Sequence, residues 1–169
     1  FKKCKRALLN ADSPFAETMR AALPKGSHCH LCSESSRFAD FMAQNIEDRG
    51  IDGIAYDLIG ENEAIHIGCP VPGSFTVMNS LLAAAGARLL GFGCEEIALA
   101  LRRFAGVRGR MEQIALPGAD FLAFVDYAHT PDALRLTLRS LRECLTQGGR
   151  LFLVFGCGGD REKEKRPIM

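Results

Sequence analysis

The most constraining feature of this sequence is a strand, helix and strand pattern over residues 121–156. The apolar stretch FLAFVDYA leads into Thr130 and Pro131, which are preferred residue types at the N-cap and first position of a helix. Leucines then recur at helical spacing until Gly148 and Gly149 end the pattern. The run RLFLVFG that follows is continuously apolar, as expected for a parallel strand covered on both faces. The pattern therefore predicts a βαβ unit.

The first half of the chain predicts a mixed sheet with helices. RALLNAD is typical of a strand, and SPFAETMRAAL of a helix with Ser13 as its N-cap and Pro14 at its first position. Three stretches rich in branched and aromatic residues predict a short antiparallel meander: DFMAQNIEDR, GIAYDLIG and EAIHIGCPV. Helical spacing returns in TVMNSLLAAAGARLLGF and CEEIALALRRF. The predicted fold class is α/β, with a domain boundary near Gly106 that divides the chain into residues 1–106 and 107–169.

Composition and charge exclude several classes of protein. The 21 basic and 20 acidic side chains give a net charge of +1, without the basic surface that nucleic acids or anionic membranes require. The most apolar stretch, SLLAAAGARLLGF, is shorter than the roughly 20 residues that cross a bilayer, and the N-terminus does not resemble a secretory signal. We therefore expect a cytoplasmic protein without nucleic-acid partners or membrane insertion. Because the chain begins with Phe1 rather than Met, we also expect a segment of a longer protein.

The cysteines do not indicate a disulfide framework, since their number is odd and they are scattered. The stretch GSHCHLCSE does hold four soft metal ligands close together: His28, Cys29, His30 and Cys32. A zinc site needs a second ligand pair, which only His66 and Cys69 could supply. An ordinary strand is the favoured interpretation.

Polar residues follow both strands of the predicted βαβ unit, at the edge where open α/β sheets bind ligands. FVDYAHTPDAL places Asp126, Tyr127 and His129 there, just before a helix N-terminus whose free N–H groups attract anions. GCGGDR places Arg161 after the next strand, where glycines allow close approach and an arginine can bind a carboxylate or phosphate. The alternatives are a capped helix in the first case and a surface turn with an ion pair in the second.

Two further residues are candidates by position. Arg110, in RGRME between the two halves, could reach an anion bound there, or it could be a solvated arginine. Asn10, at the end of the first strand, could hydrogen-bond a base edge or cap a turn. Neither G-x-G-x-x-G opening a helix nor G-x-x-x-x-G-K-[ST] occurs in the sequence. If the complete protein uses ATP, we expect its main phosphate loop to lie outside this segment.

A set of motifs occurs in the order LNADSP, GSFTVMNSLLAA, GRMEQI, VDYAHTPDAL and FGCGGDREKEKRPIM. Together they resemble the Mur ligases of bacterial cell-wall synthesis, and within that family the MurE type. The resemblance implies that residues 1–106 are the later part of a central ATPase domain and that residues 107–169 open a Rossmann-like C-terminal domain. It places the N-terminal domain, the phosphate loop and the magnesium ligands upstream, and the rest of the C-terminal domain downstream.

Carried over residue by residue, the resemblance implies ATP-binding roles for Asn10, Arg110, Asp126 and His129. It implies that Arg161 binds the carboxylate of the incoming amino acid. No catalytic residue or metal ligand is expected within the chain. Three positions depart from the family pattern, namely Ser13, Ser74 and Thr76.

The implied reaction is ATP-dependent amide-bond formation in peptidoglycan precursor synthesis. The carboxylate of UDP-N-acetylmuramoyl-L-alanyl-D-glutamate takes the γ-phosphoryl group of ATP, with Mg²⁺ as cofactor. The amine of meso-diaminopimelate or L-lysine then attacks the acyl phosphate. We expect most of the catalysis to come from positioning of the reactants and neutralisation of their charge. We expect the segment alone to be inactive. The alternatives are a related ligase of the folylpolyglutamate or cyanophycin synthetase type, and a noncatalytic fragment that binds nucleotide or protein.

Overall fold

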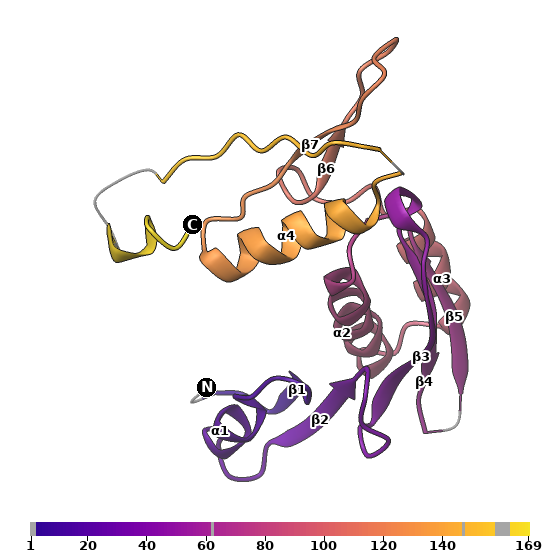
Figure 1. Cartoon of the computed structure of the whole chain (residues 1–169). Helices are drawn as coiled ribbons and strands as arrows, with labels where there is room; N and C mark the ends of the chain where they lie inside the picture. The colour runs from indigo at the N-terminus through magenta and orange to yellow at the C-terminus, as the bar shows by residue number, and fades with distance from the viewer. Residues whose placement is uncertain (1–2, 62, 147, 158–162) are drawn as a thin grey trace.

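The computed structural model describes residues 3–61, 63–146, 148–157 and 163–169, and its largest unit is a five-stranded sheet (Figure 1). In spatial order the strands are β1 (Arg6–Asn10), β2 (His28–Ser33), β3 (Phe41–Asp48), β4 (Ile54–Ile59) and β5 (Ala64–Cys69). β1, β2 and β3 are parallel, whereas β3, β4 and β5 are antiparallel to their neighbours. The predicted mixed sheet with a short antiparallel meander is confirmed.

The helix after β1 starts later than the sequence suggests. It is the short α1 (Ala16–Ala21), and its N-cap is Phe15 rather than the predicted Ser13. The chain first makes a turn, in which the Ser13 carbonyl accepts a bond from the Ala16 N–H at 3.0 Å. The Ser13 hydroxyl accepts one from the Phe15 N–H at 3.3 Å. The cap prediction was wrong because Ser13 serves this turn instead of the helix N-terminus.

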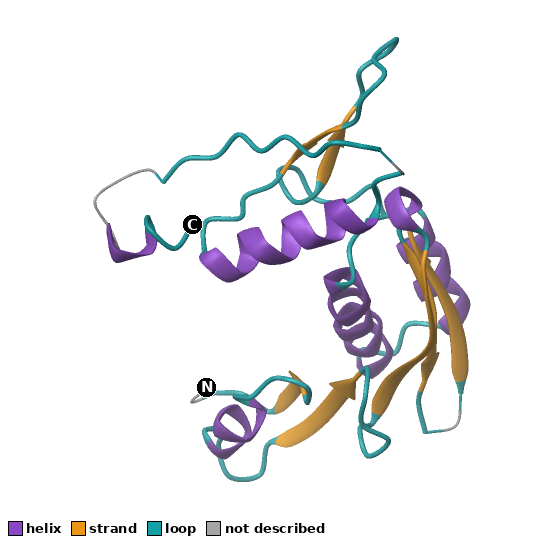
Figure 2. Cartoon of the chain, viewed as in Figure 1, coloured by secondary structure: helices purple, strands orange, loops and turns teal. Residues whose placement is uncertain are grey.

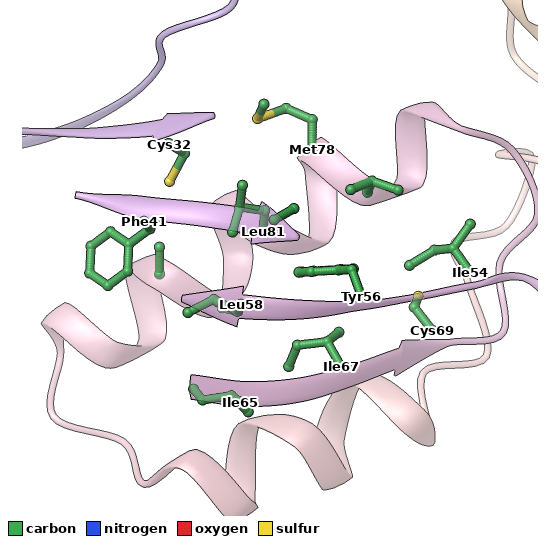
Figure 3. Packing of buried hydrophobic residues seen from close by; sticks show 14 of the residues in the cluster. Cys32, Phe41, Ile54, Tyr56, Leu58, Ile65, Ile67, Cys69, Met78 and Leu81 are labelled. Atoms are coloured by element: carbon green, nitrogen blue, oxygen red, sulfur yellow. The ribbon is translucent and has the colours of Figure 1, made fainter. Parts of the chain in front are cut away.

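Two helices cover the sheet and close its core. α2 (Phe75–Leu89) packs against β1–β4, and α3 (Cys94–Arg102) packs against β5 and α2. Alternate residues of the central strands point into this layer, so Tyr56, Leu58 and Ile67 are fully buried together with Leu81 of α2 (Figure 3). The Ser80 hydroxyl lies 3.1 Å from that of Tyr56 and gives the buried phenol a hydrogen-bond partner. In the described ranges, none of the helices has the length and apolar composition that crossing a bilayer requires.

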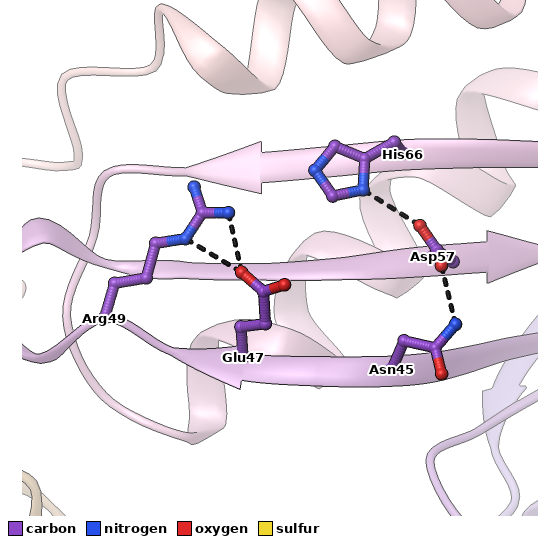
Figure 4. A network of polar contacts seen from close by, with 5 residues as sticks. All are labelled: Asn45, Glu47, Arg49, Asp57 and His66. Atoms are coloured by element: carbon purple, nitrogen blue, oxygen red, sulfur yellow. Dashed lines mark hydrogen bonds and ion pairs between the residues drawn. The ribbon is translucent and has the colours of Figure 1, made fainter.

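The other face of the meander is polar (Figure 4). Asp57 accepts a hydrogen bond from Asn45 at 2.8 Å and lies 2.9 Å from Nδ1 of His66 on β5. The hydrogen bonds from Asn45 and then His66 hold the pKa of the Asp57 carboxyl below its ordinary value. Asn45 sits at a break in the β3–β4 register with a left-handed φ of 51°. The cluster therefore joins the irregular part of β3 to β4 and β5.

The C-terminal part contains a small antiparallel pair and one long helix (Figure 2). β6 (Glu112–Ile114) pairs with β7 (Ala123–Val125), and α4 (Pro131–Glu143) follows. The predicted cap of α4 is confirmed, because the Thr130 hydroxyl accepts a hydrogen bond from the Ala133 N–H at 3.2 Å. At the other end of α4, Cys144 lies close to Gly50 in the 3-10 helix η1 (Gly50–Asp52). A second 3-10 helix, η2 (Lys163–Lys165), lies near the C-terminus.

The second strand of the predicted βαβ unit is not formed. Residues 151–157 have no strand assignment, and Val154 is 100% exposed. Leu151 and Leu153 line a shallow depression beside Leu138 of α4. A buried parallel strand needs a ladder partner and cover on both faces, and among the described residues β7 pairs with β6 and not with this segment. The predicted parallel pairing of this segment was therefore wrong, while the α/β class with mixed sheet and helices is confirmed.

Candidate functional site

Arg110 is presented by a tight turn before β6. Val107 and Arg110 form an isolated bridge, and Gly109 between them has a φ of 70°. The next residue, Met111, is buried and has a φ of 47°, a conformation that costs a non-glycine residue about 1–2 kcal/mol. The Glu112 carboxylate accepts a hydrogen bond from the Gly109 N–H at 2.6 Å. The turn is strained at Met111 and held by the Glu112 carboxylate, which fixes the backbone on both sides of Arg110.

Asp126, at the end of β7, ties this turn to α4. Its Oδ2 accepts a hydrogen bond from the Met111 N–H at 2.8 Å. Its Oδ1 accepts one from the Ala128 N–H at 2.7 Å and lies 3.5 Å from the Thr137 hydroxyl. Both oxygens of this predicted ATP-binding residue thus contact protein donors. The structure therefore adds an anchoring role to Asp126, and its contact with nucleotide remains a prediction.

Three exposed side chains contact one another in turn beside this anchor. The Arg110 guanidinium lies 5.0 Å from the centre of the Tyr127 ring, within the range of a cation–π contact. The Tyr127 and His129 rings follow at 4.9 Å between centroids and an angle of 55°. The Tyr127 N–H also donates to the Gly109 carbonyl at 2.7 Å, and His129 Nδ1 lies 3.0 Å from the Tyr127 carbonyl oxygen. We call Arg110, Tyr127 and His129 the aromatic stack.

The aromatic stack combines chemical groups that suit a planar, anionic ligand. It offers a guanidinium, a phenol and an imidazole on an exposed surface, with Tyr127 64% exposed. Helix α4 begins directly after His129 and Thr130, and the free N–H groups of its first turn favour negative charge. Sequence reasoning placed Tyr127 at this edge without assigning it a site role. Its position between Asp126 and His129 was the signal that could have suggested one.

One further predicted site residue, Asn10, does not join this group in the structure. Asn10 ends β1, and Figure 1 shows β1 and α4 on two separate arms of the chain. Its Oδ1 accepts a hydrogen bond from the Asp12 N–H at 2.8 Å. Arg161 lies outside the described residues. The structure thus brings together Arg110, Asp126 and His129, and places Asn10 elsewhere.

The cysteine and histidine cluster forms the ordinary strand that was favoured, namely β2. His28, His30 and Cys32 share one face of β2 but follow one another at roughly 7 Å along the extended strand, and Cys29 points to the other face. Burial raises the pKa of the Cys32 thiol to about 12. Among the described residues there is no group of three or more histidine, cysteine or acidic side chains that could hold a metal ion.

Comparison with known proteins decides the family. Residues 109–169 match the model of the glutamate ligase domain of Mur ligases. The chain is 41% identical over 167 residues to the UDP-N-acetylmuramoyl-L-alanyl-D-glutamate–2,6-diaminopimelate ligase of Thermosynechococcus vestitus. The chain belongs to the Mur ligase family. The matched stretch covers 97% of this chain and 32% of that relative, so the chain spans about a third of the length of the curated Mur ligases it matches.

Solved structures agree with the assignment to the Mur ligases. A structure of a UDP-N-acetylmuramoyl-L-alanyl-D-glutamate–2,6-diaminopimelate ligase superposes with a TM-score of 0.69 at 32% identity, over 98% of this chain and 34% of that one. The folylpolyglutamate synthase of Mycobacterium tuberculosis has a TM-score of 0.64 at 17% identity, over 83% of this chain and 31% of that one. At that identity the likeness shows a common fold alone. The domain division near Gly106 remains a prediction.

Proposed function

We propose that this chain supplies nucleotide-binding surfaces to a MurE-type ligase that joins 2,6-diaminopimelate to UDP-N-acetylmuramoyl-L-alanyl-D-glutamate at the expense of ATP. The observation that carries the proposal is the aromatic stack, held by Asp126 at the N-terminus of α4, in a chain 41% identical to a ligase of that name. The names of the relatives favour 2,6-diaminopimelate over L-lysine as the amine substrate.

The proposed chemistry makes an amide in two steps. A carboxylate oxygen of the D-glutamyl group attacks the γ-phosphorus of ATP, the bond to the β,γ-bridging oxygen breaks, and ADP leaves. The amine then attacks the carbonyl carbon of the acyl phosphate, and inorganic phosphate leaves with the former carboxylate oxygen. Negative charge develops on the phosphoryl group throughout, and the enzyme accelerates such reactions mainly by positioning and charge stabilisation.

The chain's own residues divide these tasks. Arg110 is a permanent cation on an exposed turn, so it suits a phosphate. Tyr127 and His129 offer ring faces and polar edges to the nucleotide. Asp126 connects the turn that carries Arg110 to the end of β7 by accepting hydrogen bonds from the Met111 and Ala128 N–H groups. For Asn10 we propose the adenine contact and for Arg161 the amino-acid carboxylate, as the family resemblance implies. The family relationship also supports a role in peptidoglycan synthesis and a cytoplasmic location.

Nucleotide binding tests the surface directly. We expect the chain to bind ADP in isothermal titration calorimetry, and Arg110→Ala to weaken this binding by about tenfold, the loss of one charge-assisted contact. Arg108→Ala is the matched control, because Arg108 is an exposed arginine two positions away in the same turn. Equal affinities for Arg110→Ala and the parent chain would remove Arg110 from the site.

The ligase activity is tested on the complete natural protein. We expect incorporation of labelled 2,6-diaminopimelate in preference to L-lysine. With ¹⁸O in the D-glutamyl carboxylate, the acyl-phosphate route transfers one labelled oxygen to inorganic phosphate. Unlabelled phosphate would contradict that route, and preferential incorporation of L-lysine would contradict the proposed substrate.

A further inference from the structure

The loops that follow the parallel strands β1 and β2 meet at Asp12. Its Oδ1 accepts hydrogen bonds from the hydroxyls of Ser33 at 2.6 Å and Ser35 at 2.7 Å. Its Oδ2 accepts one from the Glu34 N–H at 2.7 Å. The Ser33 side chain is fully buried, and its hydroxyl in turn accepts from the Ser36 N–H at 2.6 Å. One carboxylate thus orders the start of the loop after β2.

The same residue fixes the side chain of Asn10. The Asp12 N–H donates to Asn10 Oδ1 at 2.8 Å, and the Ala11 N–H donates to the Cys32 carbonyl at 2.8 Å. The Asn10 amide oxygen is therefore turned toward its own backbone, and its NH₂ group is left as the donor for a ligand. The carboxyl ends of parallel strands form the edge at which open α/β sheets bind ligands.

The Asp12 carboxylate is well suited to this anchoring task. Burial by itself would raise the pKa of Asp12, but the hydrogen bonds from Ser33, the Glu34 N–H and Ser35 outweigh it and hold the pKa below its ordinary value. The group therefore remains an acceptor for all three donors at neutral pH.

We propose that Asp12 is a positioning residue, which orients the Asn10 amide toward the adenine nucleotide by tying the β1 loop to the β2 loop. The nucleotide part of this inference rests on the proposed function, whereas the tie between Asp12, Asn10 and the β2 loop does not. Asp12→Asn replaces one acceptor oxygen with a donor group, which cannot satisfy both sets of protein donors. The orientation of Asn10 then becomes loose.

The first measurement needs no nucleotide. In ¹⁵N NMR spectra of the chain we expect Asp12→Asn to shift the side-chain NH₂ resonances of Asn10, and to speed exchange of the Glu34 amide by about tenfold, the loss of one bond to a charged acceptor. Asp52→Asn is the matched control, because Asp52 is an exposed aspartate on η1. Unchanged Asn10 resonances and Glu34 exchange in Asp12→Asn would overturn the proposal.

The second measurement separates positioning from a general loss of structure. With a fluorescent ADP analogue, we expect Asp12→Asn to weaken binding by about tenfold in the parent chain and to have no effect in an Asn10→Ala background, since coupled residues are not additive. An equal loss in both backgrounds would overturn the proposal. If the parent chain binds no ADP, the proposed function loses its nucleotide role, and the NMR measurement still decides whether Asp12 orients Asn10.

A milder variant covers the case in which Asp12→Asn does not fold. Ser35→Ala removes one exposed donor to Asp12 and leaves the carboxylate and the buried Ser33 in place. We expect a smaller shift of the Asn10 resonances in the same direction. If Asp12→Asn does not fold, the proposal is overturned by a folded Ser35→Ala chain whose Asn10 resonances and ADP affinity equal those of the parent chain.

Discussion

The sheet region, residues 6–102, and the C-terminal region, residues 107–169, differ in how completely they bury their apolar side chains. In the sheet region, Tyr56 of β4 and Leu81 of α2 are 0% exposed and lie in the same core (Figure 3). In the C-terminal region Met111 and Leu134 are buried, but Phe152 is 76% and Val154 100% exposed. Five strands and two helices close a core, whereas a three-residue ladder and one long helix do not. We therefore infer that most of the folding free energy resides in the sheet region.

The largest expected effect is the loss of folding stability when a methyl group is added at Gly53 in the sheet region. Gly53 has a φ of 98°, and a Cβ there would lie 2.0 Å from the Cys69 carbonyl oxygen. Backbone strain and overlap together predict that Gly53→Ala lowers the free energy of unfolding by about 4 kcal/mol. Gly118 has a φ of 82° with open space around it, so Gly118→Ala should cost only about 1 kcal/mol. Urea unfolding followed by circular dichroism measures both, and equal costs would contradict the comparison.

Removing buried volume should come next. Leu81→Ala opens a cavity beneath α2, and we expect a loss of about 3 kcal/mol in the free energy of unfolding. Val154→Ala is the matched truncation in the C-terminal region, where full exposure predicts a change within about 0.5 kcal/mol. A comparable loss for Val154→Ala in the same urea experiment would show that residues 151–157 are packed in solution.

The helix cap should have a moderate and local effect. Thr130→Ala removes the acceptor for the Ala133 N–H and should destabilise α4 by about 1 kcal/mol. Because little else is packed in this region, the change should appear as faster amide exchange at the start of α4 and leave the exchange of β4 unchanged. Thr146→Ala, at an exposed threonine beyond α4, is the control. Faster exchange throughout β4 would instead indicate that the two regions unfold together.

The smallest effect concerns the polar face of the meander (Figure 4). Because the pKa of Asp57 is lowered in the folded chain, its carboxylate stabilises the fold above the ordinary aspartate pKa of about 4. This stabilisation is lost as the pH falls through the lowered pKa. Asp57→Ala should therefore be less stable than the parent chain at about pH 7, and the difference should shrink toward about pH 3. A difference that does not change with pH would contradict the assignment.

Local patterns predicted most of the fold and part of the site. Alternating residues predicted the meander, and Thr130 with Pro131 predicted the start of α4. The sequence also predicted that Asp126 and His129 follow the same strand end, and in the structure both lie just after β7. It did not predict the stacking of Arg110 on Tyr127, because that contact depends on a strained turn closing against β7. The ligand roles of these residues, and of Asn10 and Arg161, remain predictions.

The element types, the cap of α4 and the family can be predicted from the amino-acid sequence, because each depends on neighbouring residues or on motifs that occur in a fixed order. Which apolar stretches are buried depends on the folded chain: Ile65 and Ile67 lie beneath helices, whereas the equally apolar residues 151–155 lie largely exposed. The tertiary structure also decided that Asp126 and Asp12 serve as anchors. The physical reason is the same in both cases. Burial and hydrogen bonding depend on partners that are distant in the chain. The residues next to an apolar or acidic side chain in the sequence do not show whether such partners are in place.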